Sequence, residues 1–337
     1  MDDNILEVRN LRTDFVTEEK TVHAVNDVSF EIKRGETFGL IGESGCGKSV
    51  TCRSLMRLLK EPGKITGGEI LYNGQNVLDY NKKELQTFRG KEIGMIFQDP
   101  MTTLNPVLTM ESQIVESIKN NKMSKQQKRE RAEELLKLVG IPSAKQRLKS
   151  YAHEFSGGMR QRAMIAIALA SEPHLLLADE PTTALDVTIQ DQIIKLLKQL
   201  KKEFKMSLVL VTHDLGVASE MCDHIAVMYA GRIMEMAKAE EIFKTPRNPY
   251  TYGLMRAIPS LEKKGEKLYS IDGMPPNLDD MPKGCAFSPR CDFCEQICKE
   301  KIPELKEVSP GHYSRCHCIE KLNKQIQKQR QGGIANE

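Results

Sequence analysis

The chain has 337 residues, enough for one large domain or two of moderate size. Its 49 Lys and Arg nearly balance its 46 Asp and Glu, which excludes a protein built mainly to coat nucleic acid. No apolar run approaches the ~20 residues that a membrane span requires, and the acidic, polar start of the sequence is not a signal peptide.

The first half of the chain changes pattern near residue 97. Up to that point short apolar runs alternate with turn residues and predict strands, with one clear helix beginning near Lys48. From Asp99 to about Pro173 the pattern is helical. Ser124 and Gln127 have capping-box spacing at the start of one of these helices, and Gly140 is expected to end it.

After Pro173 strands and helices alternate again. The continuous apolar runs 175–178 and 207–212 predict strands buried on both faces, with a helix beginning at Asp186 between them. Residues 225–236 predict a hairpin.

The last third of the chain has a different composition. Prolines accumulate between 245 and 290 and predict extended or looped structure, and the polar residues 320–337 predict a frayed helix or disorder. Nothing in the sequence indicates secretion, so disulfides are not expected. Six of the nine cysteines are nevertheless close together: Cys285, Cys291, Cys294, Cys298, Cys316 and Cys318.

Residues 42–49, with the sequence GESGCGKS, fit the phosphate-loop pattern G-x-x-x-x-G-K-[ST]; they follow an apolar run and open a helix. Glycines let successive backbone N–H groups point at phosphate oxygens, and the helix N-terminus adds a positive dipole end. Lys48 can reach the β- and γ-phosphates, and the Ser49 hydroxyl can bind Mg²⁺. The positions expected to contact ATP are Gly42, Glu43, Ser44, Gly45, Cys46, Gly47, Lys48 and Ser49.

The apolar run 175–178 ends in two carboxylates, Asp179 and Glu180. After a phosphate loop, this pattern predicts that Asp179 belongs to the Mg²⁺ shell and that Glu180 is the general base for water. Two solvated acids at a strand end are the alternative, and the pattern alone would not distinguish the two.

Residues 155–159, FSGGM, resemble the LSGGQ signature of ABC ATPases and lie between the two nucleotide motifs, as in that family. Ser156 is a good helix N-cap, while Gly157 and Gly158 permit close backbone approach to an anion. Met159 stands where the family usually has Gln, which leaves the backbone contact intact.

The resemblance covers about residues 5–260 and implies further roles. Gln98 resembles the Q-loop glutamine, which contacts Mg²⁺, and 184–186 the D-loop, including Asp186. His213 resembles the switch histidine and Phe15 an adenine-stacking aromatic. The implied catalytic set is Glu180, His213, Lys48 and Gln98. In the family, the phosphate loop of one chain faces the signature of another, with ATP between them.

The fold implied by the resemblance is α/β, a P-loop ABC-type nucleotide-binding domain over residues 1–244. A mixed sheet is expected from residues 1–97 and 174–235, and a helical subdomain from 98–173. The outer surface of that subdomain near Gln98 is expected to meet a membrane permease.

Residues 245–251 and 284–291, TPRNPYT and GCAFSPRC, resemble the C-terminal extension of ATP-binding subunits from bacterial di- and oligopeptide importers, which nickel importers share. The resemblance implies an extension over 245–320, a polar tail over 321–337, and a [4Fe–4S] cluster held by Cys285, Cys291, Cys298 and Cys316. Structural Zn²⁺ or reduced thiols are the alternatives. Cys294 and Cys318 could substitute as ligands.

The function implied is ATP hydrolysis that powers di- or oligopeptide import, with nickel import as the alternative. The expected partners are a second ATP-binding subunit or a second copy, two membrane permeases and an extracellular peptide-binding protein, but no nucleic acid. The expected location is peripheral, on the cytoplasmic face of the plasma membrane.

Two rival functions remain open. A soluble ABC ATPase acting on DNA or ribosomes would have a long coiled coil between its nucleotide motifs or a second phosphate loop, and this chain has neither. A redox enzyme regulated by ATP would require substrate-binding residues beside the cysteines, and the sequence offers no candidates for them.

Overall fold

The computed structural model describes residues 3–120, 122–183, 185–257 and 269–334. The chain forms two compact units, and it passes between them several times. The first unit contains Met1–Glu7, Glu31–Thr37 and Ile70–Thr212, and the second contains Val8–Phe30, Phe38–Glu69 and His213–Glu337.

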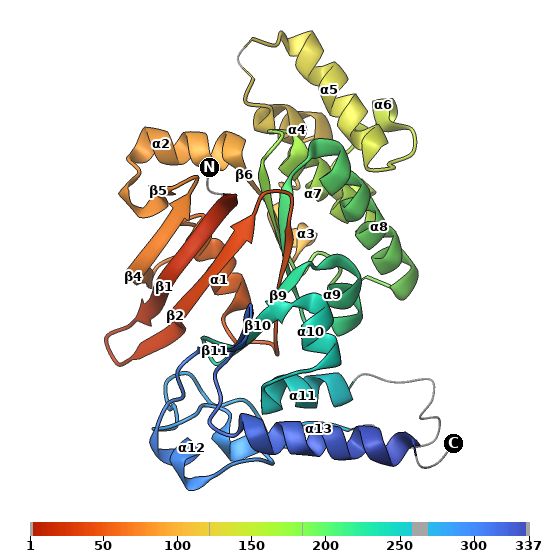
Figure 1. Cartoon of the computed structure of the whole chain (residues 1–337). Helices are drawn as coiled ribbons and strands as arrows, with labels where there is room; N and C mark the ends of the chain where they lie inside the picture. The colour runs from red at the N-terminus through yellow and green to blue at the C-terminus, as the bar shows by residue number, and fades with distance from the viewer. Residues whose placement is uncertain (1–2, 121, 184, 258–268, 335–337) are drawn as a thin grey trace. The chain divides into compact units, whose positions relative to one another are not determined.

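Three long strands contribute residues to both units. They are β1 (Asn4–Val16), β2 (Thr21–Lys33) and β4 (Gly63–Tyr72), which with β5 (Gln75–Asn76) form a four-stranded sheet in the order β2-β1-β4-β5. Figure 1 shows them in red and orange. These strands agree with the prediction for the first part of the chain.

The first unit is built on three parallel strands, β6 (Ile93–Ile96), β7 (Leu175–Asp179) and β8 (Ser207–Thr212). Every residue of the three strands is buried, as expected for parallel strands covered on both faces. The strands predicted at 175–178 and 207–212 are therefore confirmed.

Helices make up most of the rest of the first unit, as predicted for residues 99–173. They are α2 (Lys82–Thr87), α3 (Pro100–Thr103), α4 (Met110–Ser117), α5 (Lys125–Leu138), α6 (Ala144–Arg147), α7 (Gly157–Leu169) and α8 (Val187–Phe204). The capping box of Ser124 and Gln127 opens α5, and Gly140, with a positive φ of 74°, follows its end. In Figure 1, α4, α5 and α7 pack on one another.

The prediction of a single clear helix before residue 97 is wrong. Helix α2 lies there as well, followed by a π-helical turn at Phe88–Glu92. Helix α2 has six residues and is opened by a capping box between Asn81 and Glu84. None of the residues of α2 is buried, so its sequence lacks the apolar periodicity by which a helix can be detected.

The second unit combines parallel and antiparallel pairs. Strand β3 (Thr37–Ile41) pairs in parallel with β9 (His224–Tyr229), which forms the predicted hairpin with β10 (Arg232–Lys238). Strand β10 then pairs with β12 (His312–Ser314), and β12 with β11 (Lys306–Ser309). The helices of this unit are α1 (Lys48–Leu55), α9 (Leu215–Met221), α10 (Ala239–Lys244), α11 (Pro249–Arg256), α12 (Gln296–Glu300) and α13 (Ile319–Ile334).

The proline-rich region is not all loop, because α11 lies within it. Pro249 occupies the first turn of the helix, where its missing N–H costs nothing, and Asn248 caps the helix by accepting a hydrogen bond from the N–H of Tyr250. Apart from a short 3₁₀ turn at Ser288–Arg290, residues 269–295 are irregular, as predicted.

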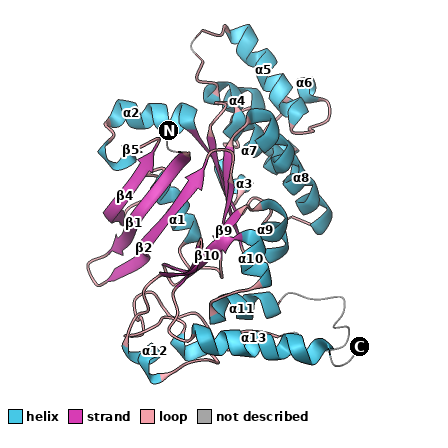
Figure 2. Ribbon diagram, in the orientation of Figure 1, coloured by secondary structure: helices cyan, strands magenta, loops and turns pink. Residues whose placement is uncertain are grey.

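The polar C-terminal region forms α13 (Figures 1 and 2). Leu322 is fully buried, and Asn323 accepts a hydrogen bond of 2.6 Å from Arg247. Residues 258–268 of the predicted extension and 335–337 of the predicted tail lie outside the described residues. The predicted boundaries at 244, 320 and 321 stay predictions.

In the described part of the chain, none of the helices combines the length and apolar character needed to cross a bilayer.

A buried polar pair joins β10 to β12. Glu235 Oε1 lies 2.6 Å from His312 Nε2 and accepts a hydrogen bond of 2.5 Å from the N–H of Arg247; both side chains of the pair are almost fully buried. We expect His312→Ala to leave the buried carboxylate short of a partner and to destabilise the second unit by about 3 kcal/mol. Urea unfolding measures this loss.

The control for this prediction is His317→Ala. His317 is exposed, and its ring lies within hydrogen-bond distance of the backbone carbonyl of Lys301. An unfolding midpoint equally low in both variants would contradict the role of the buried pair.

Candidate functional site

The loop 42–49 connects β3 to α1, and at two of its glycines an added Cβ would clash with a backbone oxygen. Gly42 and Gly47 have φ of 151° and 103°. A Cβ on Gly42 would lie 2.2 Å from the carbonyl oxygen of Met228, and one on Gly47 would lie 2.3 Å from that of Ala24. The tight curve of the loop therefore depends on residues without side chains.

Lys48 is folded into this loop. Its ammonium Nζ donates to the carbonyls of Gly42 and Glu43 at 2.8 and 2.9 Å, and the residue is only 4% exposed. Helix α1 begins here with no side-chain cap from Gly47, so no cap side chain competes with an anion at its first turn.

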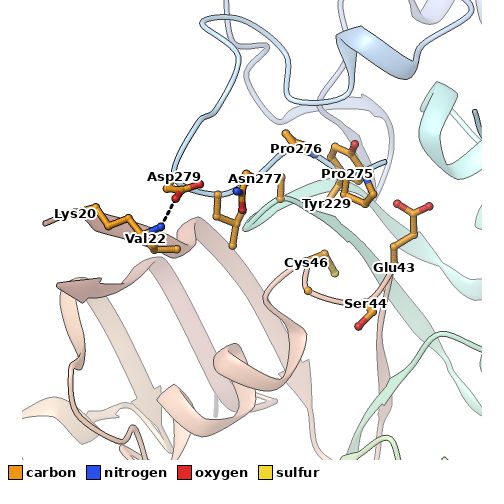
Figure 3. A pocket seen from close by; sticks show the side chains of 13 residues that line it. Lys20, Val22, Glu43, Ser44, Cys46, Tyr229, Pro275, Pro276, Asn277 and Asp279 are labelled. Atoms are coloured by element: carbon orange, nitrogen blue, oxygen red, sulfur yellow. Dashed lines mark hydrogen bonds and ion pairs between the residues drawn. The ribbon is translucent and has the colours of Figure 1, made fainter. Parts of the chain in front are cut away.

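A cavity of about 310 Å³ lies beside the loop in the second unit. Residues 43–46, Tyr229, Ala230 and Pro275–Asp279 line it, and Figure 3 shows Pro276 and Asn277 across from Ser44 and Cys46. An ion pair joins Asp279 to Lys20, which also lines the cavity. No local motif predicts this arrangement, because its residues come from distant stretches of chain.

Phe15, the predicted adenine-stacking residue, lies half-buried on β1 with its ring against Gly63. It is not among the residues that line the cavity beside the phosphate loop.

In the first unit, two predicted site residues are brought together. Gln98 Nε2 donates to Glu180 Oε2 at 3.0 Å, and the Thr183 hydroxyl donates to the same oxygen at 2.8 Å. Asp179, the last residue of β7, is fully buried. Glu180 has a positive φ of 48°, uncommon for a residue other than glycine.

The signature residues begin α7. Ser156 caps this helix by accepting from the N–H of Met159 at 3.3 Å, and Ser156 and Gly157 are exposed. Gly158 lies close to α8: a Cβ there would be 3.0 Å from Ile189 Cγ2. Asp186 caps α8, as predicted, and Ala184 of the predicted D-loop lies outside the described residues.

His213 follows β8 directly and is exposed, and the next residue, Asp214, caps α9. The predicted site residues are thus divided between the units. Gln98, Ser156, Asp179, Glu180 and Asp186 belong to the first; Phe15, the phosphate loop and His213 belong to the second. Their assembly into one site stays a prediction.

The four cysteines predicted to bind a cluster line one pocket. Cys285, Cys291, Cys298 and Cys316 are joined there by Cys318, whereas Cys294 is not among the lining residues. The sulfurs of Cys298 and Cys318 are 3.5 Å apart, and none of the six cysteines forms a disulfide.

The chemistry of this pocket depends on burial. Burial raises the pKa of Cys285, and raises that of Cys291 and of Cys318 to about 12, so these thiols are protonated at neutral pH unless a metal displaces the proton. Among the described residues, no three His, Cys, Asp or Glu side chains group as a single metal ion requires.

Comparison with known proteins agrees with these geometries. Residues 25–183 match a family described as ABC transporter, and residues 234–298 match the oligopeptide/dipeptide transporter C-terminal region. The chain is 49% identical to the oligopeptide transport ATP-binding protein OppD of Salmonella typhimurium, over 93% of each chain. It is 47% identical to the dipeptide transport ATP-binding protein DppD of Bacillus subtilis, over 93% of this chain and 94% of the relative.

The chain belongs to the ABC transporter ATP-binding proteins of the OppD/DppD type. A solved dimeric ATP-binding cassette with ADP and Pi, 31% identical, superposes with a TM-score of 0.63 over 69% of this chain and 98% of that one. The predicted ABC-type fold is therefore confirmed, and as a member of this family the chain is an ATPase.

Proposed function

We propose that this ABC ATPase powers the import of di- or oligopeptides through a membrane transporter. The observation that carries the proposal is the match of residues 234–298 to the oligopeptide/dipeptide transporter C-terminal region. The similarity to OppD and DppD over more than nine-tenths of the chain supports it.

The test is transport by the complex purified from its native membrane and reconstituted in vesicles. We expect ATP-dependent uptake of a labelled di- or oligopeptide, and loss of that uptake when ATP is replaced by a non-hydrolysable analogue. Uptake of Ni²⁺ without peptide uptake would overturn the substrate assignment, and identification of the copurifying chains tests the partners.

We also propose roles for the site residues. Backbone N–H groups of residues 42–49 and Lys48 would hold the ATP phosphates, and Ser49, Gln98 and Asp179 would hold Mg²⁺, which would offset phosphate charge. Glu180 accepts a proton from the attacking water, while His213 contributes to catalysis and Phe15 stacks on adenine. The Gln98 contact to Glu180 supports the roles of these two residues, and the curvature of the glycine loop supports the phosphate-binding role of residues 42–49.

A second ATP-binding chain, different or identical, would complete each site. Ser156, Gly157, Gly158 and Asp186 of one chain would contact the nucleotide held by the phosphate loop of the other. The exposure of Ser156 and Gly157 at the start of α7 supports this, because an anion from another chain can reach that helix end.

Two permeases and an extracellular peptide-binding protein are the other proposed partners, which would hold the chain on the cytoplasmic face of the membrane. The helical part of the first unit offers a surface for a permease. Met101 and Val107 are 64% and 76% exposed, and a groove of about 210 Å³ that includes Phe97, Leu104 and Leu108 lies in the same region. Exposed apolar side chains beside a groove are typical of docking surfaces.

We propose that Cys285, Cys291, Cys298 and Cys316 hold a [4Fe–4S] cluster, which would join segments of the extension. Their shared pocket supports this assignment, because four thiolates on short loops are suitable ligands for such a cluster. Cys318 lines the same pocket and is the candidate substitute for one of the four.

Cys298→Ser is expected to lose bound iron and the broad visible absorption of a cluster, because Cys298 is a buried member of the pocket. Anaerobic purification followed by iron analysis and a visible spectrum measures this. Cys294→Ser is the matched control and should keep both, since Cys294 does not line the pocket. A colourless wild-type protein with stoichiometric zinc would contradict the assignment.

A further inference from the structure

An arginine of the cysteine-containing region reaches the phosphate loop. Arg290, directly before Cys291, forms a two-pronged ion pair with Glu43, the second residue of the loop, although 247 positions separate them. Its NH1 lies 2.7 Å from Glu43 Oε2 and its NH2 lies 3.0 Å from Oε1. The arginine side chain is only 5% exposed, so water screens this pair little.

The remaining donors of Arg290 are also engaged. Nε donates to the carbonyl of Asp272 at 3.0 Å, NH2 to that of Ile271 at 3.4 Å, and NH1 to the Tyr229 hydroxyl at 3.3 Å. A guanidinium fixed on every nitrogen presents its fork to the carboxylate in one orientation.

The backbone of Glu43 is held by the same region. The N–H of Glu43 donates to the hydroxyl of Tyr250 in α11 at 3.0 Å. The rings of Tyr250, Tyr229 and Phe287 pack together, with centroids 4.6 to 5.4 Å apart. The main chain and the side chain of Glu43 are therefore both held by residues that lie far away in the sequence.

The charge of Glu43 makes this contact important for an anionic ligand. A carboxylate on a loop that binds triphosphate repels the ligand, by about 1 kcal/mol or more at close range even with strong screening. The bidentate arginine neutralises that charge and directs the carboxylate toward the extension.

We propose that Arg290 is a positioning residue for nucleotide binding: by pairing with Glu43 it removes an unfavourable charge from the phosphate loop and fixes the loop's second residue. The inference rests on the proposed nucleotide site at residues 42–49. It makes the cysteine-containing extension part of the machinery that binds ATP.

The test measures the affinity of the full-length protein for a fluorescent ATP analogue with Mg²⁺. We expect Arg290→Ala to weaken binding about tenfold, which corresponds to about 1.4 kcal/mol. Glu43→Gln should bind more tightly than wild type, because it removes a carboxylate from the loop. Combining Glu43→Gln with Arg290→Ala should recover most of the lost affinity. Arg256→Ala is the control and should bind as wild type does, because exposed Arg256 lies over the rings of Tyr252 and Tyr269 and does not line the cavity beside the phosphate loop.

Recovery of affinity in the double variant would show that Arg290 acts by neutralising the charge of Glu43 and not only by stabilising the structure. If the double variant binds as weakly as Arg290→Ala, or if Arg290→Ala binds like wild type, the inference is overturned. If the alanine variant fails to fold, Arg290→Lys takes its place, because lysine keeps the positive charge but cannot form the bidentate contact. We then expect a smaller loss of affinity, which Glu43→Gln reverses. Unchanged binding by Arg290→Lys overturns the inference. A folded wild type that binds no nucleotide would overturn the proposed function itself.

Discussion

Glu180→Gln should slow ATP hydrolysis by at least about 100-fold while ATP still binds, because glutamine cannot accept a proton from water. The substitution keeps the shape of the side chain and an oxygen that can accept from the Thr183 hydroxyl, 2.8 Å away in the structure. Phosphate release at saturating ATP measures the loss. Size-exclusion chromatography with ATP should show the variant trapped as a dimer, since nucleotide remains between the chains.

The matched control is Glu172→Gln. Glu172 also has a positive φ, 52° against 48° for Glu180, but it is exposed and pairs with Arg131 on the surface of the same unit. It should hydrolyse ATP at the wild-type rate. Normal turnover by Glu180→Gln would refute its role as general base.

Gly47→Ala should abolish measurable nucleotide binding, a loss of about 100-fold or more. The new methyl group would lie 2.3 Å from the carbonyl oxygen of Ala24, a backbone atom that has no side-chain rotation to relieve the clash. The loop must therefore open, and a displacement of about 1 Å at a site of this kind can cost 100-fold. Titration with a fluorescent ATP analogue measures the loss.

Gly35→Ala isolates the steric part of this effect. Gly35 also has a positive φ, 72°, but a Cβ there meets no atom within 4 Å. Both variants thus carry the backbone cost of about 1 kcal/mol for alanine in that region, and only Gly47→Ala carries the clash. Equal binding by the two variants would show that the loop tolerates a side chain at Gly47.

Local features could be predicted from the sequence because their physical cause is local. The capping box at Ser124 and the cap at Asp186 each depend on residues three positions apart. The glycine loop and the strand ending in Asp179 were recognisable for the same reason. The helix at Pro249 was missed, because a proline in the first turn has the same composition signal as a loop.

Contacts between distant residues could not be predicted. Nothing near Glu43 indicates Arg290, and nothing near Lys20 indicates Asp279, because neither pair leaves a spacing pattern in one sequence. The cysteine motif identified the region that forms the pocket. Spacing alone did not decide between Cys318, which lines the pocket, and Cys294, which does not.

Residues that contact one another in the second unit are far apart in the sequence, and this has a consequence for biosynthesis. Residues 38–41 of β3 are fully buried beside β9, whose residues 224–227 emerge from the ribosome much later, and Arg290 follows Glu43 by 247 positions. At about 5–20 residues synthesised per second, roughly 10 to 50 seconds pass between the synthesis of the phosphate loop and that of Arg290. A nascent chain cut short before β9 lacks the strand that pairs with β3, so we expect such a fragment to expose the apolar residues of β3 to the quality-control machinery of the cell.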